Sequence, residues 1–342
     1  MKTKSLSFLF LAAFVLFSCS QEDIRISRIP APPYLNNPNE RDIVLKGKYP
    51  FTYWKKDDSD NSLPQFRTSL DSFIIIDDDL EPAGFDKTFI PSRKGLDELK
   101  ISGSGQINNK GLLILKDYLR VIHTGRIAVL DLRSETHGFL NETGVSLTGN
   151  RGWGNIGKTT SEVIIEERDS LFKYLNKQLI VSGEEFFVES ASTEEAICAA
   201  NGFIYMRIPA LDYAPFPSDA LIDNFVSFVK GLPKNTWLHF HCAQGRGRTT
   251  LFMVLYDIMK NPDLNMDDII YRQYLLGGAF LYDELKDYPK EWVSELAHER
   301  NLLLPIFHQY VKDCKKNNFT LSWSDWKNMK YDFSVIPESG GV

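Results

Sequence analysis

Residues 236–260 constrain the fold more than any other part of the chain. Residues 236–241 form a continuous run of mostly apolar and aromatic side chains, which is typical of a buried strand. A loop with two glycines follows, and then a helical pattern over 248–260 that stops at Asn261 and Pro262. A strand, a glycine loop and a helix in this order place a helix N-terminus beside the loop, an arrangement suited to binding phosphate.

Strand and helix patterns alternate through the second half of the chain. Strands are predicted at 127–132 and 203–208, and apolar spacing predicts an amphipathic helix over 217–230. This alternation favours an α/β fold with a mostly parallel, twisted sheet flanked by helices. Further helices are expected over 266–276 and 290–315. Parts of 50–80 and 177–195 are more strand-like and are predicted to form a small strand-rich subdomain.

The sequence of the glycine loop suits a sulfur nucleophile. The loop is preceded by His241 and Cys242 and is followed by Thr249. A thiolate is a strong nucleophile, and a helix N-terminus or a nearby cation favours that ionised form. The Thr249 hydroxyl is expected to donate to the sulfur, and His241 to orient the loop by hydrogen bonding. Cys242 is therefore the candidate nucleophile.

The remaining loop residues are candidates for holding an anion. Gly245 and Gly247 let the backbone curl, so that the amide groups of Ala243, Gln244, Gly245, Arg246 and Gly247 point inward as a nest. Arg248 offers a planar fork of donors that matches two phosphoryl oxygens. Arg246 either makes the loop more positive, which suits a ligand with several phosphates, or points into solvent.

A phosphate ester also needs a proton donor for its leaving group. Asp212 lies in the proline-rich segment 211–217, after a predicted strand and about 30 residues before Cys242. It is the preferred candidate acid. Asp219 and Asp223 are its competitors.

Two other interpretations of the loop are an inert buried cysteine in a glycine-rich turn and a metal site. No second cysteine or histidine stands at ligand spacing, so we predict no metal and no cofactor. The net charge of −6 does not favour binding to nucleic acid. Any polyanionic ligand must then be held by a local basic site.

The first residues have the pattern of an export signal. Two lysines precede a short apolar run, and Cys19 directly follows Ser18 at the end of that run. We predict a signal peptide over 1–18, lipidation at Cys19, a proline-rich tether over 19–40, and a catalytic domain over 41–342. The protein would be an exported lipoprotein, anchored in the periplasm or at the cell surface of a bacterium. Cys198 and Cys314 either pair or remain buried thiols.

Several segments resemble the protein-tyrosine-phosphatase-like phytases, a branch of the cysteine phosphatase superfamily. The resemblance runs through 211–278, including the loop itself, and extends upstream to 66–69, 95–97, 101–104 and 131–139. The resembling segments occur in the same order as in the family, and together they cover nearly all of the predicted mature chain. The sequence departs from the family pattern at Ala243 and Gln244, where the family has Glu-Ala, and at Arg246, where it has an apolar residue.

The resemblance implies a phosphatase-like core with a small partial barrel, and stepwise removal of phosphates from inositol polyphosphates without a metal. It assigns Cys242, Arg248 and Asp212 to the nucleophile, phosphate-binding and acid roles. Arg67 would reach a substrate phosphate, or else be structural. A phosphatase for phosphotyrosine or phosphoinositides is the alternative enzyme, and a non-catalytic phosphate-binding lipoprotein is the alternative outside enzymes.

Overall fold

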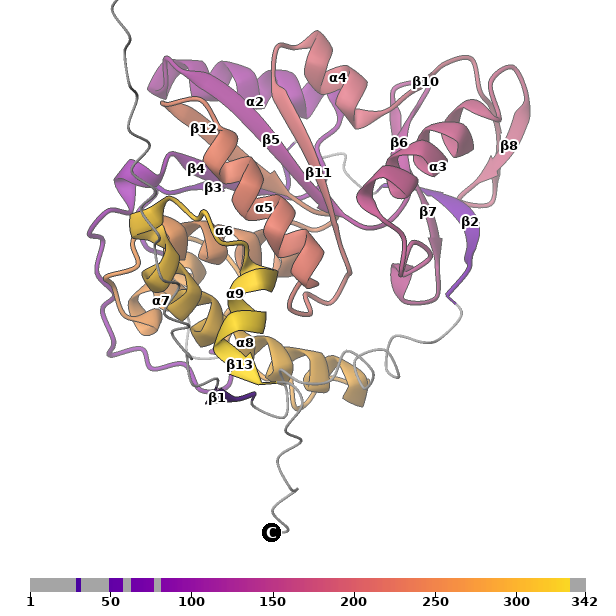
Figure 1. Cartoon of the computed structure of the whole chain (residues 1–342). Coiled ribbons are helices and arrows are strands. Elements are labelled where there is room, and N and C mark those ends of the chain that lie inside the picture. Colours follow the sequence, from indigo (N-terminus) through magenta and orange to yellow (C-terminus); the bar gives the residue numbers. More distant parts are fainter. Residues whose placement is uncertain (1–28, 32–48, 58–62, 77–80, 333–342) are drawn as a thin grey trace, which may run out of the picture.

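The computed structural model describes residues 29–31, 49–57, 63–76 and 81–332 (Figure 1). Two larger sheets and a short two-stranded pair make up its strands. The fold is mixed α/β with helices flanking the sheets, as the sequence predicted.

The five-stranded sheet has the order β11-β5-β12-β4-β3. The strands β11 (Ile204–Ala210), β5 (Arg126–Arg133), β12 (Thr236–His241) and β4 (Ile101–Ser104) run parallel, and β3 (Arg67–Thr68) is antiparallel to β4. Three of these strands coincide with the predicted ones. Because the parallel strands share one direction, their carboxyl ends meet at one edge of the sheet, and that is where Cys242 follows β12.

Helices cover both faces of this sheet (Figure 1). Alternate residues of β5 point to opposite faces. Ile127 and Val129 join the core beneath α2 (Asn109–Ile122) and α4 (Glu194–Ala200). Ala128 and Leu130 join the larger core formed with the C-terminal helices, which are α5 (Asp219–Gly231), α6 (Gly247–Lys260), α7 (Met266–Leu275), α8 (Glu291–Cys314) and α9 (Trp323–Lys330). The helix α6 lies at the centre of that layer, because its residues from Arg248 to Met259 are all buried.

The second sheet has six strands in the order β10-β6-β7-β2-β8-β9. It combines β2 (Phe51–Lys56) with β8 (Gln178–Val181), β9 (Glu184–Phe187) and β10 (Ala191–Ser192), which come from the two predicted strand-rich regions. It also contains β6 (His137–Leu140) and β7 (Thr143–Gly149), which the sequence analysis did not predict. The helix α3 (Thr160–Phe172) packs on β6. The partial barrel and the domain boundaries remain predictions.

A third strand pair joins the beginning and the end of the described chain. β1 (Ile29–Pro30) runs parallel to β13 (Tyr331–Asp332), and Ala31 beside it is fully buried. This part of the predicted tether is therefore packed against the fold. The predicted signal peptide and Cys19 lie outside the described residues. Within the described ranges, no helix combines the length and apolarity needed to cross a membrane.

The two remaining cysteines are separate, buried thiols. Cys198 lies in the core beneath α2 and α4, whereas Cys314 ends α8 in the larger core. Burial raises the pKa of the Cys198 thiol, so this thiol stays protonated and unreactive. The structure therefore favours the second of the two alternatives left open by the sequence.

Candidate active site

Cys242 lies at the carboxyl end of β12, with only 3% of its surface exposed. The backbone amide of Gly245 donates to its Sγ at 3.2 Å, and the Thr249 hydroxyl lies at the same distance. Both contacts favour negative charge on the sulfur because a thiolate accepts hydrogen bonds better than a thiol does. Thr249 therefore has the contact that the sequence predicted.

The tight curve of the loop depends on Gly245. Its φ is +77°, a left-handed conformation that residues with a side chain rarely adopt. A Cβ at this position would lie 2.4 Å from the amide nitrogen of Gly105. The loop is thus pressed against the segment that follows β4, and only glycine fits there.

Arg248 lies in the first turn of α6 and is 2% exposed. Glu135 holds it with two parallel contacts, at 2.6 Å to Nη1 and 2.9 Å to Nη2. Burial alone would raise the pKa of the Glu135 carboxyl, but Arg248 and Arg133 hold that pKa well below its usual range. The ion pair fixes the plane of the guanidinium. The Nε atom of Arg248 is buried without a hydrogen-bond partner among the described residues, so it remains able to bind a ligand.

Asp212 follows β11 and reaches the same guanidinium. Its Oδ1 lies 3.2 Å from Nη2 of Arg248, and its side chain is 45% exposed. The two residues after it, Tyr213 and Ala214, both have positive φ, which curls this segment back toward the loop. A Cβ at Gly247 would lie 3.2 Å from that of Ala214, so the two loops are in close approach.

The competing carboxylates lie elsewhere. Asp219 accepts from the Trp323 indole and pairs with Lys327, and Asp223 accepts from the backbone and side chain of Ser324. Both therefore hold α9 against α5. Among the three candidate acids, Asp212 is the one that contacts Arg248.

Arg67 contacts the glycine loop and the first turn of α6. It is 2% exposed, and it donates to the carbonyl of Gly245 at 2.7 Å and to the hydroxyl of Thr250 at 3.1 Å. Burial lowers its pKa to about 10, and Cys242 and Arg246 are close enough to influence it electrostatically. Of the two roles considered from the sequence, the contacts of Arg67 favour the structural one, and contact with a substrate phosphate remains a prediction.

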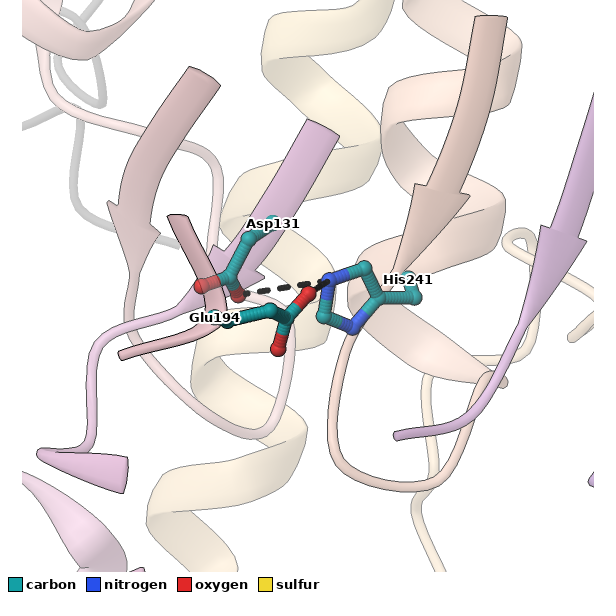
Figure 2. Close-up of side chains that lie close together, drawn as sticks. All are labelled: Asp131, Glu194 and His241. Atoms are coloured by element: carbon teal, nitrogen blue, oxygen red, sulfur yellow. Dashed lines mark ion pairs between the residues drawn. The ribbon is translucent and has the colours of Figure 1, made fainter. Parts of the chain in front are cut away.

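His241 points toward two buried carboxylates (Figure 2). Its Nε2 lies 2.6 Å from Oε1 of Glu194 and 3.8 Å from Oδ1 of Asp131. Neither ring nitrogen makes a hydrogen bond of good geometry with a described residue, so these are short charge contacts. The hydrogen bonding to the loop that we predicted for His241 is therefore not found, because the ring faces the network behind the nucleophile.

Asp131, Glu194 and His241 together have donor atoms that a metal ion could use, within 4.8 Å of one another. However, cations of the protein already lie against these carboxylates. Arg207 donates to Asp131 at 2.8 Å, and His137 lies 3.2 Å from Asp131 and 3.3 Å from Glu194. Burial would raise the pKa of Asp131, but Arg207 and His137 hold it well below its usual range. We interpret the group as a buried ion-pair network.

The rim of the loop is open. The side chains of Gln244 and Arg246 are exposed, and Ala243 is half-buried with its carbonyl accepting from the amide of Gln106 at 3.0 Å. Gly247 begins α6 directly after this rim. An exposed arginine at the entrance adds positive charge where an anionic ligand would approach.

Sequence reasoning missed Glu135 and Glu194. Glu135 lies between β5 and β6, and Glu194 begins α4, so neither is near the loop in the sequence. One signal was present: a buried arginine beside an anion site needs a fixed carboxylate, and Glu135 stands in the segment 131–139 noted for its resemblance. Its role could not be assigned from that alone.

The parallel sheet, the loop at a helix N-terminus with the Gly245 amide on the cysteine sulfur, and the paired Arg248 define the cysteine phosphatase class of architecture. The model of the PTP-like phytase family, described as "Inositol hexakisphosphate", matches residues 177–260. The match includes Cys242 and the loop that follows it, so this segment of the chain is similar to that family.

Solved structures extend this similarity to most of the chain. The PTP-like myo-inositol phosphatase of Mitsuokella multacida, in complex with myo-inositol-(1,3,4,5)-tetrakisphosphate, is 39% identical with a TM-score of 0.76 over 82% of this chain. The present chain spans about half of that protein, 49%. A PTP-like phytase from Bdellovibrio bacteriovorus is 27% identical with a TM-score of 0.65, covering 82% of this chain and 96% of its own.

A shorter relative matches at the sequence level. The uncharacterized protein AvrBs1.1 of Xanthomonas campestris pv. campestris is 42% identical over 90 residues. These residues are 26% of this chain and 86% of that protein.

We predict that the free energy of unfolding depends on the charge of His137. Burial opposes its ionisation, but Asp131 and Glu167 raise its pKa to about 9 from a usual 6.5. The stabilisation is then complete below pH about 6.5 and is lost as the pH rises through about 9. The free energy of unfolding, measured by urea denaturation, should fall by on the order of 1–3 kcal/mol across this window. The variant H137Q should show a flatter profile, and parallel profiles would contradict the prediction.

Proposed function

We propose that the protein hydrolyses phosphate monoesters through a phosphocysteine intermediate. The observation that carries this proposal is the surroundings of Cys242. Its sulfur accepts hydrogen bonds from Gly245 and Thr249, and it lies near enough to Arg248 to influence that group electrostatically. Nε of Arg248 has no hydrogen-bond partner among the described residues. A sulfur that accepts two hydrogen bonds, near a guanidinium whose plane is fixed, suits attack on a phosphoryl group.

The reaction has two steps. In the first, the thiolate of Cys242 forms a bond to phosphorus while the bond from phosphorus to the leaving oxygen breaks, and Asp212 gives its proton to that oxygen. In the second, the Asp212 carboxylate takes a proton from water, whose oxygen bonds to phosphorus as the sulfur leaves. Arg248 and the loop amides hold the phosphoryl oxygens through both steps.

The proposed substrates are inositol polyphosphates. The relative from Mitsuokella multacida is described with an inositol tetrakisphosphate bound. In this chain, Arg246 is exposed at the rim of the loop, where it can contact a second phosphate of the same ligand. Several phosphates on one small ring would use both cations at once, whereas a simple phosphate monoester would use Arg248 alone.

Replacing the nucleophile gives the first test. Cys242→Ser should reduce phosphate release from inositol hexakisphosphate by at least about 10³-fold, because an alcohol at this site is a far weaker nucleophile than a thiolate. The assay compares inositol phosphates, phosphotyrosine peptides and phosphoinositide vesicles, in the presence of a thiol reductant. Undiminished activity in the serine variant would refute the mechanism. Preference for phosphopeptides or lipids would instead support the alternative phosphatase classes.

Asp212→Asn tests the acid. The loss of kcat should be on the order of 10²–10⁴-fold for inositol phosphates, whose alkoxide leaving groups need a proton. It should be smaller for p-nitrophenyl phosphate, whose leaving group is stable as an anion. Asp219→Asn, which alters a carboxylate that contacts α9, is the matched control. An equal loss with both substrates would point to another proton donor.

Glu135→Gln tests the positioning of Arg248. Without a charged partner the guanidinium can move, and kcat/KM should fall by about 10²-fold. The rate of alkylation of Cys242 by iodoacetamide is the second readout, because it reports the sulfur and not the arginine. If both rates fall together, Glu135 supports the loop as a whole and not Arg248 in particular.

A further inference from the structure

A basic cavity lies at the edge of the five-stranded sheet opposite the active site. Its volume is about 540 Å³, which is within the range of small-molecule binding sites. Thr236, the first residue of β12, lines it, and Cys242 follows the other end of that strand. Six residues of strand separate the two places by about 20 Å. The cavity is therefore separate from the catalytic loop.

Five lysines line this cavity, together with a single acidic residue, Glu98. The lysines come from four places that are distant in the sequence: Lys100 before β4, Lys230 and Lys234 around the end of α5, Lys260 at the end of α6, and Lys315 after α8. The whole chain has a net charge of −6. The cavity is thus positively charged, although the protein as a whole is negatively charged.

Hydrogen bonds hold three of the ammonium groups in place. Lys230 donates to the carbonyl of Phe319 at 2.6 Å, Lys315 to the carbonyl of Lys260 at 2.7 Å, and Lys100 to the side chain of Asn235 at 2.5 Å. An ammonium has three donors, so each of them retains capacity for a ligand. These bonds place the charges around the cavity without neutralising them.

The other two ammonium groups have no anionic partner. Nζ of Lys234 and Nζ of Lys260 make no hydrogen bond or ion pair with the described residues, and the Lys260 ammonium lies over the ring of Tyr256 at 4.9 Å. Burial and the nearby charge of Lys315 lower the pKa of Lys260. An anion in the cavity would relieve this repulsion between like charges.

The ordinary explanation for such lysines is that cations favour helix C-termini. It accounts for Lys230, Lys260 and Lys315, which lie at the ends of α5, α6 and α8. Lys100 follows only a three-residue 3-10 helix, Asp97–Leu99, which has little dipole. The explanation does not account for Lys234, which lies beyond the end of α5 and precedes β12, nor for the cavity that all five lysines line. A binding site accounts for both.

We propose that this cavity is a second, non-catalytic site for a compact ligand that has several phosphate groups. Clustered phosphates match clustered ammonium groups, and a ligand of that kind fits the volume of the cavity. Both a free inositol polyphosphate and the headgroup of a phosphoinositide lipid have this chemistry. The inference does not depend on the activity proposed for Cys242.

Calorimetric titration of the full chain with inositol hexakisphosphate tests the proposal. The Cys242→Ser variant prevents turnover, and low salt preserves the attraction between charges. The double change K234Q/K260Q removes the two lysines with the fewest structural contacts. It should remove one equivalent of bound ligand or weaken that equivalent at least tenfold, whereas K110Q/K116Q, two lysines of α2, should leave the isotherm unchanged. Identical isotherms for the two double variants would overturn the proposal.

A second measurement needs no lysine substitution. Inositol hexakisphosphate should slow the acetylation of Lys234 and Lys260 by acetic anhydride, read by mass spectrometry, and should not slow that of Lys110. Equal rates with and without ligand would overturn the proposal. Because only these lysines are compared, failure of catalysis at Cys242 would leave the result unchanged.

Vesicle sedimentation then identifies the source of the phosphates. Phosphatidylcholine vesicles with phosphatidylinositol bisphosphate are compared with phosphatidylcholine alone. Binding that is lost in K234Q/K260Q would assign the cavity to a lipid headgroup. Protection by the soluble ligand, without binding to vesicles, would assign it to a free polyphosphate.

Discussion

The buried ion pair between Glu135 and Arg248 is the interaction on which the rest of the site depends. Two charges taken out of water are costly unless each has its partner in good geometry. Glu135 stands in the connection between β5, in the five-stranded sheet, and β6, in the six-stranded sheet. Arg248 begins the central helix α6. The pair can form only when both sheets and this helix are packed together, so the active site is formed at their junction.

Next to this pair lies a second group of buried ionisable side chains, in which cationic groups alternate with carboxylates. Arg207 contacts Asp131 and Glu167, and His137 lies among Asp131, Glu167 and Glu194. The network ends at His241, the residue before the nucleophile. Asp131 and Glu194 keep their charge in a buried setting because cationic groups lower the pKa of each carboxyl. The loop therefore has a rigid, charged support on one side, and Arg67 holds it on another.

The parts of the fold that could be predicted are those whose strands and helices have a clear local sequence pattern. The strand, glycine loop and helix over 236–260 appear where periodicity placed them. The strand predicted over 127–132 is one residue longer at each end, and the one predicted over 203–208 runs over 204–210. In contrast, β6 and β7 were missed. Both contain glycine and short polar stretches, so their alternation is weak, and they are strands because β2 and β10 pair with them. Pairing partners distant in the sequence leave no local signal.

The chemistry around Cys242 was determined by the sequence itself, because its main partners lie within seven residues and Gly245 permits the left-handed turn that the loop needs. The tertiary structure alone decided which carboxylate holds Arg248, since Glu135 is 113 residues away. It also decided that Arg67 faces the loop and that five scattered lysines share one cavity. Ion pairs and cavities depend on which segments meet in space, and only the packing of the two sheets and their helices brings these segments together.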